Sequence, residues 1–199
     1  MPEKALFWEN RNALVIADLH LGKATHFRKN GIAIPKSVEL ENFERLSTLI
    51  LQHEPVSVLI LGDLFHSDKN NQWAVFEKFL SKFSEIEFHL IMGNHDILNL
   101  DNYTHKNLSV HKEELKWGQI LMTHHPLQLK GYYNLCGHIH PGVKIMGRGR
   151  QSLRLSCFYF GQHQGILPAF GAFTGLYVLD VKPEDSVYGI VEDTVVKLG

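Results

Sequence analysis

Residues 13–20 read ALVIADLH. The first five are apolar, favour β-structure and are too few for a helix, so they predict a buried strand that ends at Asp18. Residues 56–61 and 88–92 form two further apolar runs of this kind, and each is followed directly by a glycine and a polar residue. The three runs therefore predict three core strands, each with a polar group at its carboxyl end.

Apolar residues at helical spacing fill the segments between these runs, in residues 35–53 and 73–83. The resulting strand–helix–strand–helix–strand order predicts right-handed crossovers and a mainly parallel sheet. After residue 107 the pattern changes to short strand-like runs, at residues 119–123, 132–135, 153–160 and 176–181. These predict a second, antiparallel or mixed sheet. Because no repeat or linker interrupts the chain, we expect one domain over residues 1–199.

Composition narrows the class of protein. The chain has 199 residues, 44% apolar and 21% charged, which is typical of a globular protein. A formal net charge of −1 provides no overall attraction to nucleic acid or anionic membranes, although local basic patches remain possible. No apolar run approaches the roughly 20 residues of a membrane helix. With two isolated cysteines and no secretory signal, we expect a cytoplasmic protein that does not bind membranes.

Polar side chains at the predicted strand ends indicate a ligand site. In open α/β sheets, ligands bind beyond the carboxyl ends of the strands, where Asp18, Asp63 and Asn94 are expected. The chain also has 13 histidines, and imidazole is the commonest metal ligand. Taken alone, each short motif could be only a turn or a solvated loop. His138 and His140 would share one face if they lay on a strand.

Five motifs complete this pattern. In chain order they are Asp18-Leu19-His20, Gly62-Asp63, Gly93-Asn94-His95-Asp96, Thr123-His124-His125 and Gly137-His138-Ile139-His140. Together they resemble the signature of the calcineurin-like metallophosphoesterases, with no element missing. The resemblance implies an α/β fold, a four-layer αββα sandwich of two mixed sheets flanked by helices. It also implies a phosphodiesterase with two divalent metal ions, for which Mn²⁺ is expected, with Fe or Zn²⁺ as alternatives.

The same resemblance assigns roles to individual residues. Asp63 would bridge the two metals. Asp18, His20 and His140 would complete one metal site, and Asn94, His124 and His138 would complete the other. His95 would contact the phosphate and protonate the leaving oxygen, and Asp96 would hydrogen-bond His95 and fix its tautomer. His66 and His125 adjoin the motifs, and either could line the pocket or be an exposed polar side chain.

A narrower resemblance covers most of the chain. Residues 17–23, 27–31, 62–67 and 167–175 look like the ligase-associated DNA-damage-response branch of this superfamily. That branch implies an Mn²⁺-dependent phosphodiesterase or DNA endonuclease, with DNA as substrate and DNA-repair proteins as partners. Residues 167–175 have a simpler interpretation as a tight turn under the core, which we favour over a substrate role.

Basic residues near the motifs are candidate substrate contacts. Arg28 and Lys23 follow the first motif, and Arg148, Arg150 and Arg154 follow the last one, together with Lys144. A basic segment that contains glycines could follow a nucleic-acid backbone, or it could be an ordinary solvated hairpin tip.

Two other functions fit the five motifs. One is a phosphatase or pyrophosphohydrolase acting on a small nucleotide or lipid precursor with the same metals. The other is a non-catalytic scaffold of the same fold, against which the intact His95 and seven candidate ligands argue.

Overall fold

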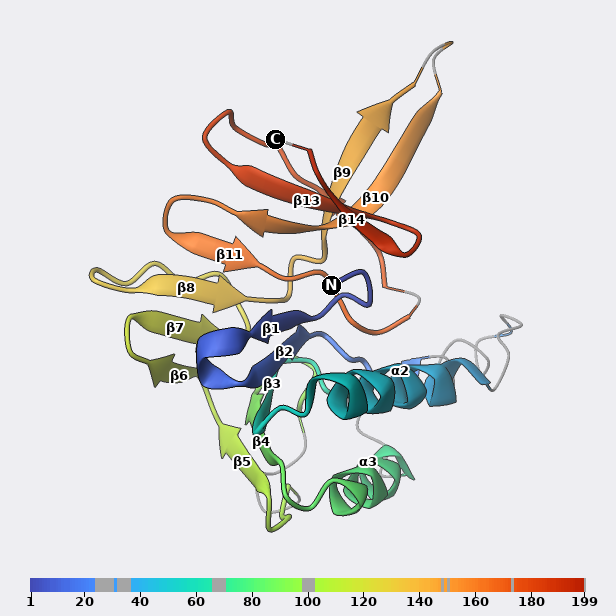
Figure 1. Ribbon diagram of the computed structural model, residues 1–199, viewed down its shortest axis with the longest axis vertical. Coiled ribbons are helices and arrows are strands. Elements are labelled where there is room, and N and C mark those ends of the chain that lie inside the picture. The colour runs from blue at the N-terminus through green and yellow to red at the C-terminus, as the bar shows by residue number, and fades with distance from the viewer. Residues whose placement is uncertain are drawn as a thin grey trace.

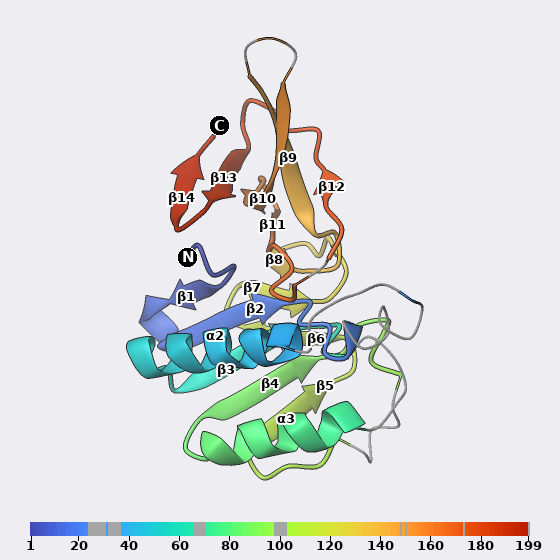
Figure 2. The same ribbon diagram turned by 90° about the vertical axis from the view of Figure 1, so that its right-hand side faces the viewer.

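Two mixed β-sheets form the centre of the protein in the computed structural model (Figures 1 and 2). The structure describes residues 1–23, 31, 37–65, 71–97, 103–147, 149, 151–172 and 174–198. The two sheets pack against each other through a layer of buried apolar side chains. Val15 and Leu61 from the first sheet meet Met122, Leu135 and Phe158 from the second in this layer.

The first sheet has five strands in the order β1-β2-β3-β4-β5. They are β1 (Leu6–Trp8), β2 (Ala13–Ala17), β3 (Ser57–Leu61), β4 (Glu87–Ile91) and β5 (Leu108–His111). Strands β2 to β5 are parallel, and β1 runs antiparallel to β2 at the edge. All five residues of β2 and of β3 are buried, because one face of the sheet meets the second sheet and the other meets helices. The three predicted core strands are therefore confirmed.

Two helices cover the outer face of the first sheet, α2 (Ser37–His53) and α3 (Asn71–Lys82) (Figure 2). Leu46 and Phe76 from these helices pack against Ile16 and Ile60 of the sheet in one buried cluster. Both predicted helices are confirmed, although the expected helix start at Pro35 lies outside the described residues. Neither helix is long and apolar enough to span a membrane.

The second sheet has nine strands, and β13 and β14 branch from β10. They are β6 (Glu114–Trp117), β7 (Ile120–Thr123), β8 (Tyr133–Cys136), β9 (Pro141–Met146), β10 (Ser152–Phe160), β11 (Gln164–Ile166), β12 (Tyr177–Val178), β13 (Ser186–Val191) and β14 (Thr194–Lys197). The α/β fold with two mixed sheets is confirmed. In the part of the chain that the structure describes, both α-helices lie on the first sheet.

Several strands of both sheets do not follow the predicted pattern. The run at residues 176–181 contains only the two-residue strand β12. The strands β1, β5, β6, β9, β11, β13 and β14 were not predicted. Most of these strands are short or half-buried, so their apolar residues are too few to stand out from the surrounding loops.

Two neighbouring histidines lie between the sheets. His89 on β4 places its Nδ1 atom 3.3 Å from Nε2 of His111 on β5, and its ring meets the Trp117 ring edge-on at 5.6 Å. Burial lowers the pKa of both imidazoles, and His111 lowers the pKa of His89 further, against a smaller opposing effect of Glu87. Folding therefore favours the neutral form of both rings.

This pair predicts a loss of stability in acid. The folded pKa of each ring lies below the unfolded value of about 6.5, so the unfolded chain binds more protons as the pH falls below that value. The contribution is fully present above about pH 6.5 and is lost towards lower pH. Urea unfolding of the metal-free protein between pH 8 and pH 5 should show a shallower pH dependence for His89→Leu than for wild type. His163→Leu, at an exposed histidine, is the control. Equal slopes for wild type and His89→Leu would contradict the prediction.

Candidate metal centre

Seven candidate ligands converge on one end of the two sheets. Asp18, Asp63 and Asn94 follow β2, β3 and β4, and the parallel register of these strands places their ends side by side. His124 follows β7, and His138 and His140 follow β8 of the second sheet. His20 lies two residues beyond Asp18. The structure thus brings together every residue that was predicted to hold metal.

One group of donor atoms contains His20, His140, Asp18 and one oxygen of Asp63. The Nε2 atoms of His20 and His140 are 3.4 Å apart. Nε2 of His140 lies 3.8 Å from Oδ1 of Asp18, and Nε2 of His20 lies 3.8 Å from Oδ2 of Asp63. Donors that are each about 2.0–2.2 Å from one metal ion lie roughly 3–4 Å from one another. The spacing of this group therefore fits a shared metal ion.

The second group contains His124, His138, Asn94 and the other oxygen of Asp63. Nε2 of His124 lies 3.0 Å from Oδ1 of Asn94 and 3.1 Å from Nδ1 of His138. The same nitrogen is 3.4 Å from Oδ1 of Asp63. These distances also fit donors that share one metal ion.

The Asp63 carboxylate stands between the two groups. Its Oδ2 atom faces His20, and its Oδ1 atom faces His124. Oδ1 also accepts a hydrogen bond of 2.9 Å from the backbone N–H of His95, which fixes the orientation of the carboxylate. A buried carboxylate held in this way has the orientation required to bridge two metal ions.

The backbone around the site is strained. Asp18, His20, Asp63, His138 and His140 have φ values of 52°, 48°, 46°, 66° and 51°. A left-handed backbone costs a non-glycine residue roughly 1–2 kcal/mol, and such residues gather at functional sites. His138 and His140 do not lie on a strand, so the condition under which they would share one face is not met. Strand β8 ends at Cys136, and the two left-handed residues direct their rings into different donor groups.

The glycines of three motifs make room for the ligands. A Cβ atom on Gly62 would lie 2.1 Å from Nδ1 of His124, and one on Gly93 would lie 2.2 Å from Oδ1 of Asp63. A Cβ atom on Gly137 would lie 2.5 Å from Oδ2 of Asp18. The glycine spacing in the sequence therefore reflects close packing of the donor side chains against the backbone.

Burial keeps the imidazoles in the form that binds metal. His124 is 2% exposed, and burial is the main cause that lowers its pKa to about 4. Its Nδ1 atom lies 3.2 Å from the Leu61 carbonyl oxygen, so a proton on Nδ1 leaves Nε2 free as a donor to metal. Burial, followed by the neighbouring His125, lowers the pKa of His138. Both rings are therefore neutral at pH 7, as metal ligation requires.

Asp96 connects the loops that hold two of the ligands. Its carboxylate accepts hydrogen bonds from the backbone N–H groups of Leu64, Phe65 and Gly93, at 3.2, 3.0 and 2.9 Å. Burial raises its pKa to about 6, although the three hydrogen bonds oppose that shift. Asp96 thus ties the loop after β3, which contains Asp63, to the loop after β4. The hydrogen bond between the His95 ring and the Asp96 carboxylate stays a prediction.

His95 and Lys23 lie beside the donor groups. The ring of His95 is half-buried and meets the His20 ring edge-on, with centroids 5.6 Å apart. Burial lowers the pKa of Lys23, and the carboxylates of Asp63 and Asp18 partly offset that shift. Both side chains thus lie near the candidate metal ligands.

The remaining candidates separate into distinct regions. Arg28, Arg148, Arg150 and His66 lie outside the described residues. Arg154 lies on β10, away from the donor groups, where it pairs with Lys144 of β9. Within residues 167–175, the backbone N–H groups of Phe170 and Gly171 donate to the carbonyls of Ala17 and Asp18, at 2.8 and 3.0 Å. Phe170 is fully buried, which supports the packing interpretation of this segment.

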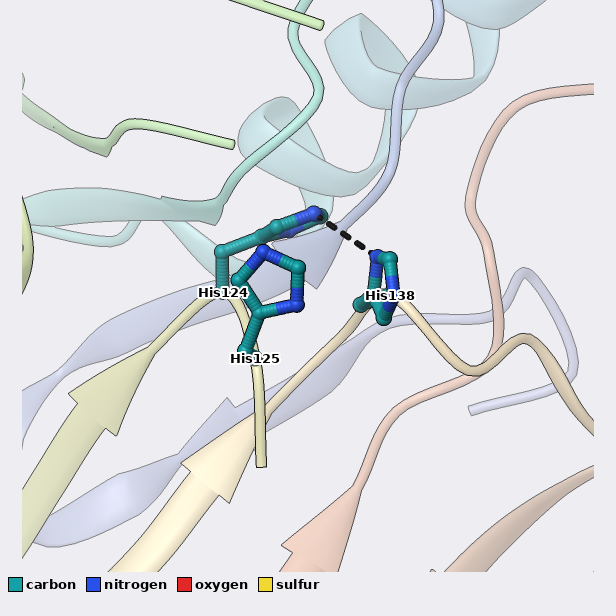
Figure 3. A group of neighbouring side chains, drawn as sticks. All are labelled: His124, His125 and His138. Atoms are coloured by element: carbon teal, nitrogen blue, oxygen red, sulfur yellow. Dashed lines mark hydrogen bonds between the residues drawn. The ribbon is translucent and has the colours of Figure 1, made fainter. Parts of the chain in front are cut away.

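His125 lines the centre. Its ring lies against those of His124 and His138, with centroids 4.7 and 4.1 Å away (Figure 3). The sequence left open whether His125 lines the pocket or is an exposed polar side chain. Strand β7 ends at Thr123, and the turn that follows brings both rings to one side.

Comparisons with known proteins agree with this site. A family model described as calcineurin-like phosphoesterase matches residues 12–159, which include all five motifs. The structure of the nuclease MPE from Pseudomonas putida is similar, with a TM-score of 0.83 and 29% sequence identity over 100% of this chain and 93% of that chain. The phosphoesterase Yfce from E. coli has a TM-score of 0.44 and 15% identity over 92% and 90% of the two chains. No curated protein sequence matched. The chain therefore belongs to the calcineurin-like phosphoesterase family and is a metal-dependent phosphoesterase.

Proposed function

We propose that this protein is a phosphodiesterase with two metal ions that hydrolyses nucleic acid. Its substrate is DNA, and it acts in DNA repair. The placement of Asp63 supports the two-metal site most directly, since its two oxygens face separate groups of imidazoles. The likeness to a nuclease over the whole chain supports a nucleic-acid substrate. A cytoplasmic location and partnership with DNA-repair proteins belong to the same proposal.

The seven ligands also suit an anionic substrate. When bound, two divalent ions would polarise the phosphoryl group and activate water for attack at neutral pH. Asp18 and Asp63 are the two carboxylates of the ligand set, and they offset only half the charge of two divalent ions. The loaded site therefore stays cationic and attracts a phosphodiester. The mixture of imidazole, carboxylate and amide donors suits Mn²⁺, with Fe and Zn²⁺ as alternatives.

His95 is assigned to proton transfer. Its backbone N–H is held by Asp63, while its half-buried ring lies beside the metal centre. An imidazole placed there can donate a proton to the leaving oxygen and contact the phosphate. The hydrogen bonds of Asp96 connect the loop after β3 to the loop after β4. They thereby help to fix the position of His95 relative to the candidate ligands.

A basic hairpin extends from the metal centre. Strands β9 and β10 project from the body of the protein, and β9 begins directly after His140 (Figures 1 and 2). Their register places Lys144 directly opposite Arg154, so the two positive charges share one face. Like charges in such a pair repel, and a bound phosphate would relieve the repulsion. Lys144 is four residues beyond His140, about 13 Å along an extended strand, so a polynucleotide could reach it from the site whereas a small diester could not.

Asp63→Asn tests the two-metal site. An amide replaces the bridging carboxylate without a change in size, and asparagine tolerates the left-handed backbone, so the fold should survive. We expect wild type to bind two Mn²⁺ ions per chain, and the variant to bind one at most, by elemental analysis after gel filtration. Asp185→Asn, at another buried carboxylate, is the control and should keep both. Two ions in Asp63→Asn would contradict the bridge.

His95→Ala tests whether His95 acts in proton transfer and not in metal binding. Because His95 is assigned no bond to metal, the variant should keep both ions and lose roughly 10²–10⁴-fold in turnover of a generic diester. Metal content and turnover are measured on the same preparation. A variant that loses its ions would refute the assignment, and unchanged turnover would remove the proton-transfer role.

Substitution of Lys144 and Arg154 by alanine tests the nucleic-acid substrate. Each lost phosphate contact should reduce the salt dependence of DNA binding by about one unit of slope in log K against log salt. Hydrolysis of a small generic diester should stay at the wild-type rate. The exposed Lys197, replaced by alanine, is the control. An equal loss in DNA binding and in diester hydrolysis would show that Lys144 and Arg154 support stability. No loss in either assay would exclude the hairpin from substrate binding. A small-nucleotide enzyme or a scaffold would show no salt-dependent DNA cleavage at all.

A further inference from the structure

His125 is placed where a metal ligand could be. Figure 3 shows its ring in one group with the rings of His124 and His138, which come from different turns. One ring nitrogen from each of the three lies within 4.8 Å of the other two. His125 is exposed, His138 is half-buried and His124 is buried, so the group extends from the interior to the surface.

A buried network holds this turn in place. The Thr123 hydroxyl donates a hydrogen bond of 2.6 Å to the carbonyl oxygen of His125, and the Asn134 side-chain amide donates one of 2.8 Å to that hydroxyl. Asn134 is 1% exposed, and its Oδ1 atom accepts a hydrogen bond from the backbone N–H of Leu127. The backbone N–H of Gly137 donates to the His124 carbonyl at 3.1 Å. The turn after β7 is thus fixed to β8, which holds the rings of His124 and His125 against His138.

We propose that His125 is a third imidazole ligand of the second metal, the one that His124, His138, Asn94 and Asp63 would hold. This assignment rests on the proposed two-metal site. It raises the number of imidazoles at that metal from two to three, while the first metal keeps His20 and His140. Imidazole favours Zn²⁺ and Fe over Mn²⁺, which prefers oxygen donors. His125 therefore makes the second site the more selective for Zn²⁺-type ions.

Ring packing alone is the competing explanation. Three neutral imidazoles can pack edge to face without sharing a metal, and the interplanar angles of 72° and 62° are compatible with such packing. Packing would not distinguish one divalent ion from another. A ligand role predicts a loss of affinity that depends on the metal.

The test is metal binding by wild type, His125→Ala and His125→Gln, measured by competition with a chromophoric chelator for Zn²⁺ and for Mn²⁺. We expect both variants to bind the second Zn²⁺ ion at least about tenfold more weakly, with a smaller change for Mn²⁺. The visible spectrum of the Co²⁺-loaded protein should change as well, because a donor is lost. His163→Ala, at an exposed histidine in the loop between β10 and β11, should match wild type in every measurement.

The outcomes distinguish the ligand role of His125 from the two-metal site on which it rests. The ligand assignment would be overturned if the variants bound both ions as tightly as wild type and the cobalt spectrum did not change. The two-metal site would remain intact in that case. An equal loss of affinity for both metals would assign His125 to packing. A wild-type protein that binds only one ion would overturn the two-metal site and this assignment together.

Discussion

Each oxygen of the Asp63 carboxylate faces a different group of imidazoles, and the surrounding backbone leaves it little freedom to turn away. The N–H of His95 holds Oδ1, and the bare backbone of Gly93 lies against the same oxygen. The left-handed conformation at Asp63 adds strain that the rest of the fold must offset. Because both groups of donors are arranged around this one carboxylate, its position determines whether the site can hold two metals.

The two sheets make that arrangement possible. Ala17, Leu61 and Ile91 are paired in register at the ends of β2, β3 and β4, which delivers the carboxylates and the amide to one edge. The second sheet contributes His124, His138 and His140 from the turns after β7 and β8. The apolar layer between the sheets therefore positions the ligands as well as stabilising the fold, because a shift of one sheet on the other would separate imidazoles from carboxylates.

Sequence patterns predicted the first sheet and the identity of the ligands more fully than the second sheet and the course of the backbone. Residues 13–17 could be predicted as a strand because both faces of a buried parallel strand must be apolar. Strand β14, which is mostly exposed, has no such requirement. The left-handed turns at His138 and His140 could not be inferred, since the enrichment of histidine in this conformation is too weak to mark single positions. The carbonyl oxygen of His125 accepts a hydrogen bond from the Thr123 hydroxyl, which in turn accepts one from Asn134 on the neighbouring strand. The place of His125 therefore depends on a contact between strands, which leaves no local pattern in the sequence.

Anomalous scattering from crystals grown with Mn²⁺ would test the two-metal centre most directly. Two peaks are expected at the carboxyl ends of β2, β3 and β4, with a different oxygen of Asp63 bound to each. One should lie among Asp18, His20 and His140, and the other among Asn94, His124 and His138. A single peak, or two peaks that do not share Asp63, would contradict a centre built around that carboxylate.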